Sequence, residues 1–136
     1  CRSMPRFAAN LSIVFTDVPF LDRFDAAAKA GFTAVEFLFP YDHPAEAVGE
    51  RLKKNSLTQA LFNLPPGNWD AGEKGFAALP ERFDDLKRSL ETALPYAKAT
   101  GVKRLHLMAG IANAAAMATV AMMNVLLFIE GLLYKI

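Results

Sequence analysis

The stretch Gly31-Phe-Thr-Ala-Val-Glu-Phe-Leu-Phe-Pro-Tyr41 constrains the fold of this chain more than any other. It is almost wholly apolar, with a single carboxylate, Glu36, in its middle. The glycine at its start and the proline after its last apolar residue predict a short strand over about residues 34–39. We expect this strand to be buried on both faces, to follow a helix and to lead into a loop. Such a strand needs helices packed over it and similar strands beside it.

The chain repeats this pattern. Its predicted strands lie at about 7–15, 34–39, 57–64 and 102–110, and its predicted helices at about 16–30, 42–55 and 81–100. This alternation favours a parallel sheet with right-handed crossovers, which occurs in doubly wound sheets and in (β/α) barrels. The first strand–helix turn, Ser12–Asp17, has none of the glycines of a dinucleotide-binding loop. We therefore favour the barrel.

A long loop separates the third predicted strand from the third predicted helix. It covers residues 65–79 and contains Trp69 together with the glycines Gly67, Gly72 and Gly75. Loops of this length are uncommon in a compact domain and often bind ligands. Two interpretations stay open, namely a lid that carries Trp69 and an ordinary surface loop with one anchored tryptophan.

Composition limits the functional class. The chain has 136 residues, of which 53% are hydrophobic, and this suits a single domain with a real core. The net charge of +1 favours no nucleic-acid partner. The one cysteine, Cys1, permits no internal disulfide, and the first residues lack the apolar segment of a secretory signal. We therefore expect a cytoplasmic protein.

The last part of the chain differs in composition from the rest. No Asp, Glu, Lys or Arg occurs from Leu105 to Ile129. A run of about 20 apolar residues can span a membrane. Asn113, Asn124 and several alanines dilute this run, and part of it belongs to the fourth predicted strand. We therefore expect a divergent apolar tail over 112–136, with an atypical apolar helix, in place of a membrane span.

Four segments of the chain resemble the hydroxypyruvate isomerase family, which belongs to the xylose-isomerase-like TIM-barrel superfamily. The resemblance runs in one register over about residues 4–111 and rests on Pro5–Ser12, Gly31–Tyr41, Phe62–Gly67 and Arg104–Gly110. It implies an eight-stranded barrel that interconverts hydroxypyruvate and tartronate semialdehyde, or a related 2-oxo sugar acid. It also implies a divalent metal, Mg²⁺ or Mn²⁺, and two glutamates that move the proton, because an aldose–ketose shift needs a base and a stabilised enediolate.

The chain departs from this family in its length. A TIM barrel takes roughly 250 residues, so residues 4–111 correspond to about four of the eight βα units. The resemblance places the metal ligands and the catalytic glutamates in the other half, and none can be assigned within 1–111. Glu130 is a remote candidate, because it follows an apolar segment similar to the family's fifth strand, although Gly131 stands where proline is expected. We expect a partial barrel that binds no metal and is inactive alone.

Ligand-binding groups of such barrels lie at the C-terminal ends of the strands. The candidates for lining a substrate site are Asn10, Glu36, Tyr41, Asn63 and His106, with Ser12 beside the first. Three of them have a structural alternative, which for Asn63 is scaffolding of the loop that follows it. Glu36 can tie neighbouring strands together, because an isolated buried carboxylate is too costly, and His106 can be a hydrogen-bonded core histidine.

Two other functions remain open. An open half-barrel exposes strand edges and apolar side chains, so the chain could be a non-catalytic association module that forms homodimers or aggregates. The third alternative is a small membrane-attached protein anchored by residues 105–129. In the enzymatic interpretation, the partner is a small 2-oxo acid.

Overall fold

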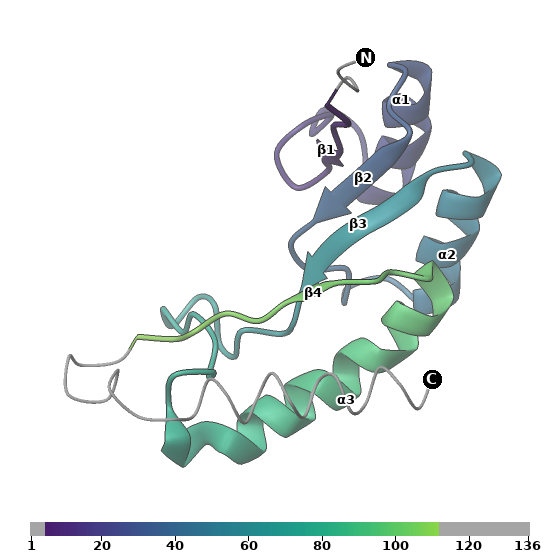
Figure 1. The fold of residues 1–136 in the computed structure, drawn as a ribbon. Helices are drawn as coiled ribbons and strands as arrows, with labels where there is room; N and C mark the ends of the chain where they lie inside the picture. The colour runs from purple at the N-terminus through teal and green to yellow at the C-terminus, as the bar shows by residue number, and fades with distance from the viewer. Residues whose placement is uncertain (1–4, 112–136) are drawn as a thin grey trace. The chain divides into compact units, whose positions relative to one another are not determined.

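The computed structural model describes residues 5–111. The predicted tail at 112–136 and the remote candidate Glu130 lie outside the described residues. Within them, strands and helices alternate along the chain (Figure 1). The elements are β1 (Ala9–Asn10), α1 (Arg23–Lys29), β2 (Ala34–Phe37), α2 (Ala45–Lys54), β3 (Thr58–Asn63), α3 (Phe83–Thr100) and β4 (Leu105–His106).

The strands form one sheet in the order β1-β2-β3-β4. Strand β2 pairs in parallel with β1 and with β3. Short 3₁₀ turns at Phe20–Asp22 and Pro80–Arg82 precede α1 and α3. The predicted α/β architecture, with a parallel sheet and helical crossovers as in part of a (β/α) barrel, is confirmed.

The contacts divide the chain into two compact units. The first contains the residues up to Phe62 together with Pro95–Leu105, and the second contains Asn63–Leu94 and the described residues from His106 onward. We describe each unit by itself.

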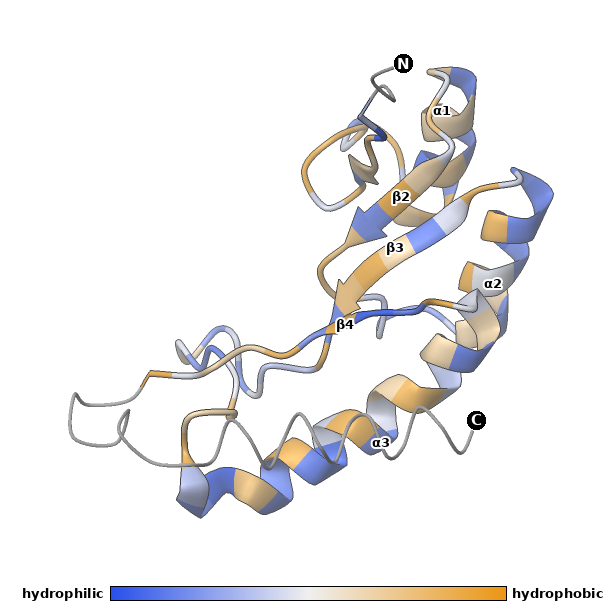
Figure 2. Cartoon of the chain, viewed as in Figure 1, coloured by the Kyte–Doolittle hydropathy of each residue, from blue (hydrophilic) through white to orange (hydrophobic). Residues whose placement is uncertain are grey.

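The core of the first unit lies between its strands and the helices α1 and α2. Figure 2 shows hydrophobic and hydrophilic residues alternating along α2. Ala45, Val48 and Leu52, which recur at helical spacing in the sequence, are all buried and form the apolar stripe of this helix. From α1, the side chains of Phe24 and Ala27 are fully buried.

Strand β2 departs from the prediction in how it is buried. Val35 and Phe37 are buried, whereas Ala34 and Glu36 are only partly buried. The prediction of burial on both faces is therefore wrong. Successive side chains of a strand point to opposite faces. The face of Val35 and Phe37 lies in the core with Phe24 of α1, and the face of Glu36 stays accessible.

The first and last strands are much shorter than predicted. After β1 the chain turns, with the backbone N–H groups of Ile13 and Val14 donating to the carbonyl of Asn10. Phe15 then takes a left-handed conformation with φ of 59°. Strand β4 covers only two residues, and His106 is exposed. The alternative of a core histidine at His106 is therefore wrong.

A β-bulge interrupts the pairing of β2 with β3. Val35 pairs with Gln59 and Phe37 pairs with Phe62, so β3 uses one more residue than β2 over this interval. Successive side chains of a strand alternate between the two faces of the sheet. One extra residue in β3 therefore moves every later side chain of that strand to the opposite face. Phe62 thus stacks on Phe37 at a centroid distance of 6.0 Å. The next residue, Asn63, then lies on the opposite face of β3.

The second unit packs the long loop at 65–79 against the start of α3. Leu64, Phe76, Leu86 and Leu90 are buried there. Ser89 of α3 donates through its hydroxyl to the carbonyl of Pro65 at 2.7 Å. The loop is therefore held by both apolar packing and hydrogen bonds.

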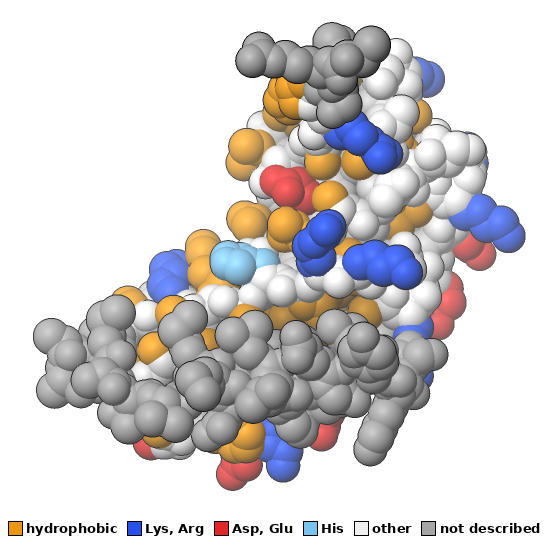
Figure 3. All heavy atoms as spheres, viewed as in Figure 1, with side chains coloured by type: hydrophobic (Ala, Val, Ile, Leu, Met, Phe, Trp, Pro, Cys, Tyr) orange, Lys and Arg blue, Asp and Glu red, His pale blue; other side chains and the backbone are white. Residues whose placement is uncertain are grey.

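Large hydrophobic side chains are also found on the surface. Figure 3 shows hydrophobic groups beside acidic and basic ones on the face in view. Phe7 and Ile13 are each 70% exposed. No helix among residues 5–111 combines the length and the hydropathy that a membrane crossing requires.

A close approach between α2 and residue Ala99 leads to a first prediction. A Cβ added to Gly49 would lie 2.5 Å from the carbonyl oxygen of Ala99. Replacing glycine by alanine inside an exposed helix normally stabilises by about 0.5–1 kcal/mol. Here we expect Gly49→Ala to lower the free energy of unfolding by about 1–3 kcal/mol, because overpacking requires the backbone to shift. Urea unfolding measures this change.

Glu50→Ala is the matched control, since Glu50 is the exposed neighbour of Gly49 on the same helix. We expect its effect to stay within about 0.5 kcal/mol. A Gly49→Ala variant as stable as the wild type would contradict the close approach.

Candidate functional site

Asn10 and Glu36 form a pair at the C-terminal ends of β1 and β2. The two residues are partners in the strand register, so their side chains lie side by side on one face. Asn10 Nδ2 donates to Glu36 Oε1 at 3.1 Å. Asn10 Oδ1 accepts the backbone N–H of Ser12 at 3.0 Å, which orients the amide with its nitrogen toward the carboxylate.

Ser12 and Leu11 extend this connection beyond the strands. The backbone N–H of Leu38 donates to Ser12 Oγ at 2.8 Å. The backbone N–H of Leu11 donates to the carbonyl of Glu36 at 2.8 Å. Glu36 therefore does tie neighbouring strands together, as the structural alternative states. Its partial exposure also leaves it accessible to a ligand.

Tyr41 belongs to an aromatic cluster of the first unit. Its ring lies 6.4 Å from that of Phe62 and 5.1 Å from that of Tyr96. Burial raises the pKa of the Tyr41 phenol strongly, and the neighbouring Tyr96 raises it further. Tyr41 is therefore a neutral hydroxyl throughout the physiological pH range. Its contact with a substrate stays a prediction.

Asn63 and His106 form a second pair, which lies in the second unit. His106 Nδ1 is 3.0 Å from Asn63 Oδ1. Asn63 Nδ2 donates to the sulfur of Met108 at 3.7 Å. The backbone N–H of Leu64 donates to the carbonyl of His106 at 3.0 Å, which aligns β4 beside the end of β3. Asn63 is only 3% exposed, whereas His106 is exposed.

Met108 also belongs to this second pair's surroundings, and it is not among the candidates predicted from the sequence. It stands two residues after His106, so both residues point to the same side if the chain stays extended. That spacing was the one available signal. It could not show that the methionine sulfur would accept the amide of Asn63, because residue 63 is distant in sequence.

The loop that carries Trp69 is fastened by charged groups. Lys74 Nζ lies 3.2 Å from the centroid of the Trp69 ring, which is 42% exposed. Glu73 accepts the backbone N–H of Asn68 at 2.5 Å and the guanidinium of Arg82 at 2.8 Å. These two hydrogen bonds, the first above all, lower the pKa of the Glu73 carboxyl.

Backbone contacts fasten the same loop further. Gly75 forms an antiparallel bridge with Ala109, and a Cβ on Gly75 would lie 2.1 Å from the carbonyl oxygen of Met108. The backbone N–H of Ala78 donates to the carbonyl of Ala109 at 2.7 Å. The loop thus has a defined structure. Whether Trp69 acts as a lid stays a prediction.

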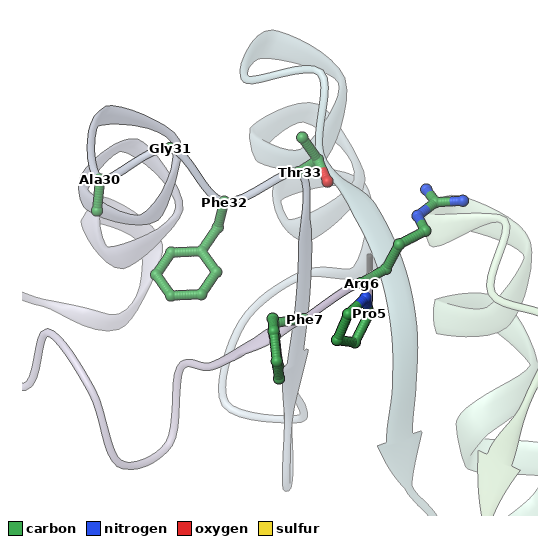
Figure 4. Close-up of a pocket in the computed structure, with 7 residues that line it drawn as sticks. All are labelled: Pro5, Arg6, Phe7, Ala30, Gly31, Phe32 and Thr33. Atoms are coloured by element: carbon green, nitrogen blue, oxygen red, sulfur yellow. The ribbon is translucent and has the colours of Figure 1, made fainter. Parts of the chain in front are cut away.

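Two cavities lie away from the predicted lining residues. The first, of about 340 Å³, is lined by Pro5, Arg6, Phe7, Ala30, Gly31, Phe32 and Thr33. These residues precede β1 and β2, so the cavity is at the N-terminal ends of the strands, an end associated with stability rather than catalysis. Figure 4 shows the rings of Phe7 and Phe32 near each other, while the Arg6 side chain extends away from them.

The second cavity, of about 220 Å³, lies in the second unit. The loop residues from Ala71 to Gly75 line it together with Leu79, Arg82 and Ile111. Glu73 and Arg82 already bond to each other at its wall.

A divalent metal does not fit the described residues by themselves. Within residues 5–111, no three His, Cys, Asp or Glu side chains gather so that they could hold an ion. Glu36 instead forms a hydrogen bond with the amide of Asn10, and His106 forms one with the amide of Asn63. No chemical step can therefore be routed through a metal held by these residues.

The Asn10–Glu36 pair leads to a second prediction. In Asn10→Asp, a carboxylate replaces the amide that donates to Glu36. We expect the free energy of unfolding at pH 7 to fall by about 1–3 kcal/mol, through loss of a charge-assisted hydrogen bond and like-charge repulsion. The deficit should shrink as the pH falls toward about 4, because one of the two carboxyls then takes up a proton and donates again. Urea unfolding at several pH values measures this.

Asn55→Asp is the matched control for this variant. Asn55 Nδ2 also donates to a carboxylate, Asp25 Oδ1, at 2.5 Å. Here Lys54 and Arg51 lie 3.1 Å and 3.4 Å from Asp25 and offset an added negative charge. Asn55 and Lys54 both lower the pKa of the Asp25 carboxyl. Equal, pH-independent losses in the two variants would contradict the role of charge at Glu36.

Comparison with known proteins agrees with this fold. The chain is 56% identical over 108 residues to the 2-oxo-tetronate isomerase of Pectobacterium atrosepticum, covering 79% of this chain and 41% of that protein. It is 44% identical over 107 residues to the hydroxypyruvate isomerase of Escherichia coli, covering 79% of this chain and 42% of that protein. The chain thus spans about two fifths of the length of these relatives.

A solved structure and a family model complete the comparison. The crystal structure of an AP endonuclease, family 2, from Brucella melitensis aligns with a TM-score of 0.79 and 53% identity, over 82% of this chain and 43% of that chain. The resemblance identified from the sequence is confirmed. Residues 24–126 match the family model described as the xylose isomerase-like TIM barrel, and this chain therefore belongs to that family.

Proposed function

We propose that this chain provides the N-terminal half of an isomerase barrel that acts on a small 2-oxo acid, hydroxypyruvate or 2-oxo-tetronate. One observation carries the proposal. Polar side chains that are held by neighbouring strands stand at the C-terminal ends of β1, β2, β3 and β4, which is where enzymes of this architecture bind their ligands. The names of the relatives, isomerases for these two acids, support the substrate class.

The proposed reaction moves a proton between neighbouring carbons of the substrate. In hydroxypyruvate, a base removes a proton from the hydroxymethyl carbon, and the electron pair shifts onto the carbonyl oxygen to give an enediolate. Return of a proton to the former carbonyl carbon, together with transfer of the terminal hydroxyl's proton to the former carbonyl oxygen, gives tartronate semialdehyde. The atoms and charges balance with no oxidant, so the site needs only proton transfer and stabilisation of charge.

The described residues suit binding and orientation in this reaction. The carboxylate of Glu36 can accept a hydrogen bond from a substrate hydroxyl, while Asn10 holds it in place. His106 is exposed and anchored by Asn63. We assign the proton-transfer glutamates to residues outside 5–111, among which Glu130 is a remote candidate.

We further propose that the 136 residues alone do not complete the site. Four strands are described, whereas a closed barrel of this type has eight. The second half would supply the groups that move the proton and the ligands for any Mg²⁺ or Mn²⁺. The cytoplasm is the proposed location, which the single cysteine supports.

Exposed hydrophobic side chains favour a second candidate, a non-catalytic association module. Phe7 and Ile13 of the first unit are each 70% exposed, and large exposed apolar groups often mark an interface. Light scattering separates the two candidates. A discrete dimer favours the association module if isomerase activity is absent both from the 136-residue chain and from a chain completed with the missing half of the barrel.

An activity assay tests the leading proposal. We expect the 136-residue chain to show no turnover of hydroxypyruvate or 2-oxo-tetronate, with or without added Mg²⁺ or Mn²⁺. A chimera that joins residues 1–111 to the remaining part of the Pectobacterium relative should be active, because the missing strands are restored. Turnover by the 136-residue chain would refute the incomplete site. A folded chimera inactive on both acids would refute the proposed function.

Glu36 provides a more specific test in the active chimera. Glu36→Gln keeps an oxygen that can accept from Asn10 but removes the charge. We expect kcat/KM to fall about 10- to 100-fold, since a hydrogen bond to a charged group contributes about 1.5–3 kcal/mol. Glu50→Gln, on the exposed side of α2, should leave kcat/KM unchanged. Equal kinetics for both variants would remove Glu36 from the site.

A further inference from the structure

The amide of Asn63 has one orientation in the structure. Its nitrogen, which can only donate, is directed at the sulfur of Met108 at 3.7 Å. Its oxygen, which can only accept, is therefore the atom 3.0 Å from His106 Nδ1. Asn63 is buried, and an amide turned around would lose its hydrogen bond to Met108 and place its oxygen against a sulfur that has no hydrogen to donate.

This orientation determines where the hydrogen of the neutral His106 ring lies. A neutral imidazole has one N–H donor and one acceptor nitrogen. Because Asn63 Oδ1 cannot donate, the hydrogen bond at 3.0 Å requires the N–H at Nδ1. The lone pair of the neutral ring is then on Nε2. The hydrogen bond of one ring nitrogen thus sets the chemistry of the other.

Two backbone features hold the pair in place. The hydrogen bond from Leu64 N–H to the carbonyl of His106 at 3.0 Å anchors β4 beside β3. The bulge in β3 puts Asn63 on the face of β3 opposite Phe62. His106 itself is exposed, so Nε2 can meet a ligand at the C-terminal end of β4.

We propose that Asn63 is a positioning residue that holds His106 as the Nδ1–H tautomer, so that Nε2 accepts a hydrogen bond from a hydroxyl group of the substrate. The identity of the substrate rests on the proposed function, whereas the tautomer does not. An acceptor nitrogen attracts a hydroxyl and gains nothing from an ionised carboxylate, which has no hydrogen to donate. His106 therefore selects 2-oxo acids that carry a hydroxyl, and it faces their hydroxyl end rather than their carboxylate end.

The tautomer can be measured in the 136-residue chain without any activity. Two-bond ¹H–¹⁵N correlation spectra of the ¹⁵N-labelled protein distinguish a protonated ring nitrogen from an unprotonated one. The spectra are recorded at about pH 8.5, above the reference imidazole pKa of about 6.5. The other histidine, His43, is assigned by comparison with His43→Gln. We expect Nδ1 of His106 to carry the hydrogen, and a hydrogen on Nε2 in the wild-type chain would overturn the inference.

Variants at Asn63 test whether this residue causes the tautomer. Asn63→Leu removes the acceptor, so His106 should lose its single tautomer while the His43 signals stay unchanged. Asn63→Asp offers only acceptor oxygens and should keep the hydrogen on Nδ1. A folded Asn63→Leu variant that keeps the wild-type pattern would overturn the positioning role. If Asn63→Leu does not fold, Asn63→Asp provides the test. A hydrogen on Nε2 of His106 in that variant would contradict the inference that residue 63 sets the tautomer.

Gln59→Met is the matched structural control. Gln59 is another buried amide of β3, and its Nε2 donates to the carbonyl of Leu61 at 2.6 Å. A loss of the His106 tautomer in this variant as well would show a general effect of core substitutions, and would contradict a specific role for Asn63.

The substrate part of the inference has its own measurement. Hydroxypyruvate added to the labelled chain should shift the ¹⁵N signal of His106 Nε2, whereas pyruvate, which lacks the hydroxyl, should not. Equal shifts, or none with either acid, would overturn the selection of a hydroxyl. Failure of the isomerase proposal would give a different result. The chimera would be inactive, whereas the 136-residue chain would still show the Nδ1–H tautomer of His106.

Discussion

The register between β2 and β3 decides which side chains enter the core and which remain accessible. Val35 pairs with Gln59, but Phe37 pairs with Phe62, because β3 contains one extra residue. Without that residue, Leu61 would lie opposite Phe37, and Asn63 would point to the same face as Phe37. With it, two aromatic rings stack in the core of the first unit. The polar residue at the end of β3 then pairs with His106.

The two polar pairs use the same physical device. In each, an asparagine amide is oriented by a partner at its other end, the backbone N–H of Ser12 for Asn10 and the sulfur of Met108 for Asn63. Asn10 therefore presents a donor to a carboxylate, and Asn63 presents an acceptor to an imidazole. Because donors and acceptors are not interchangeable, each amide imposes a specific state on its neighbour. This preorganisation suits the binding of a small polar molecule.

Gly49 and Gly75 stand where two backbone segments come close together. Gly49 lets α2 approach the carbonyl of Ala99, and Gly75 lets the long loop pair with the segment after β4. The Trp69 loop is consequently attached next to the end of β4 by its own backbone, with Glu73 and Arg82 as a further clamp. Its length therefore reflects a defined structure built from hydrogen bonds, in which the tryptophan ring is covered on one side by Lys74.

The sequence by itself determined the order of strands and helices, the parallel sheet, the family and the buried stripe of α2, because apolar periodicity and motif spacing depend only on local order along the chain. It also identified Asn10, Glu36, Asn63 and His106 as candidates for lining a ligand site. Only the tertiary structure decided the partial exposure of Glu36, the exposure of His106 and the bulge that turns Asn63. It alone also joined Met108 to Asn63. These features depend on register and on contacts between residues distant in sequence, which no local pattern encodes.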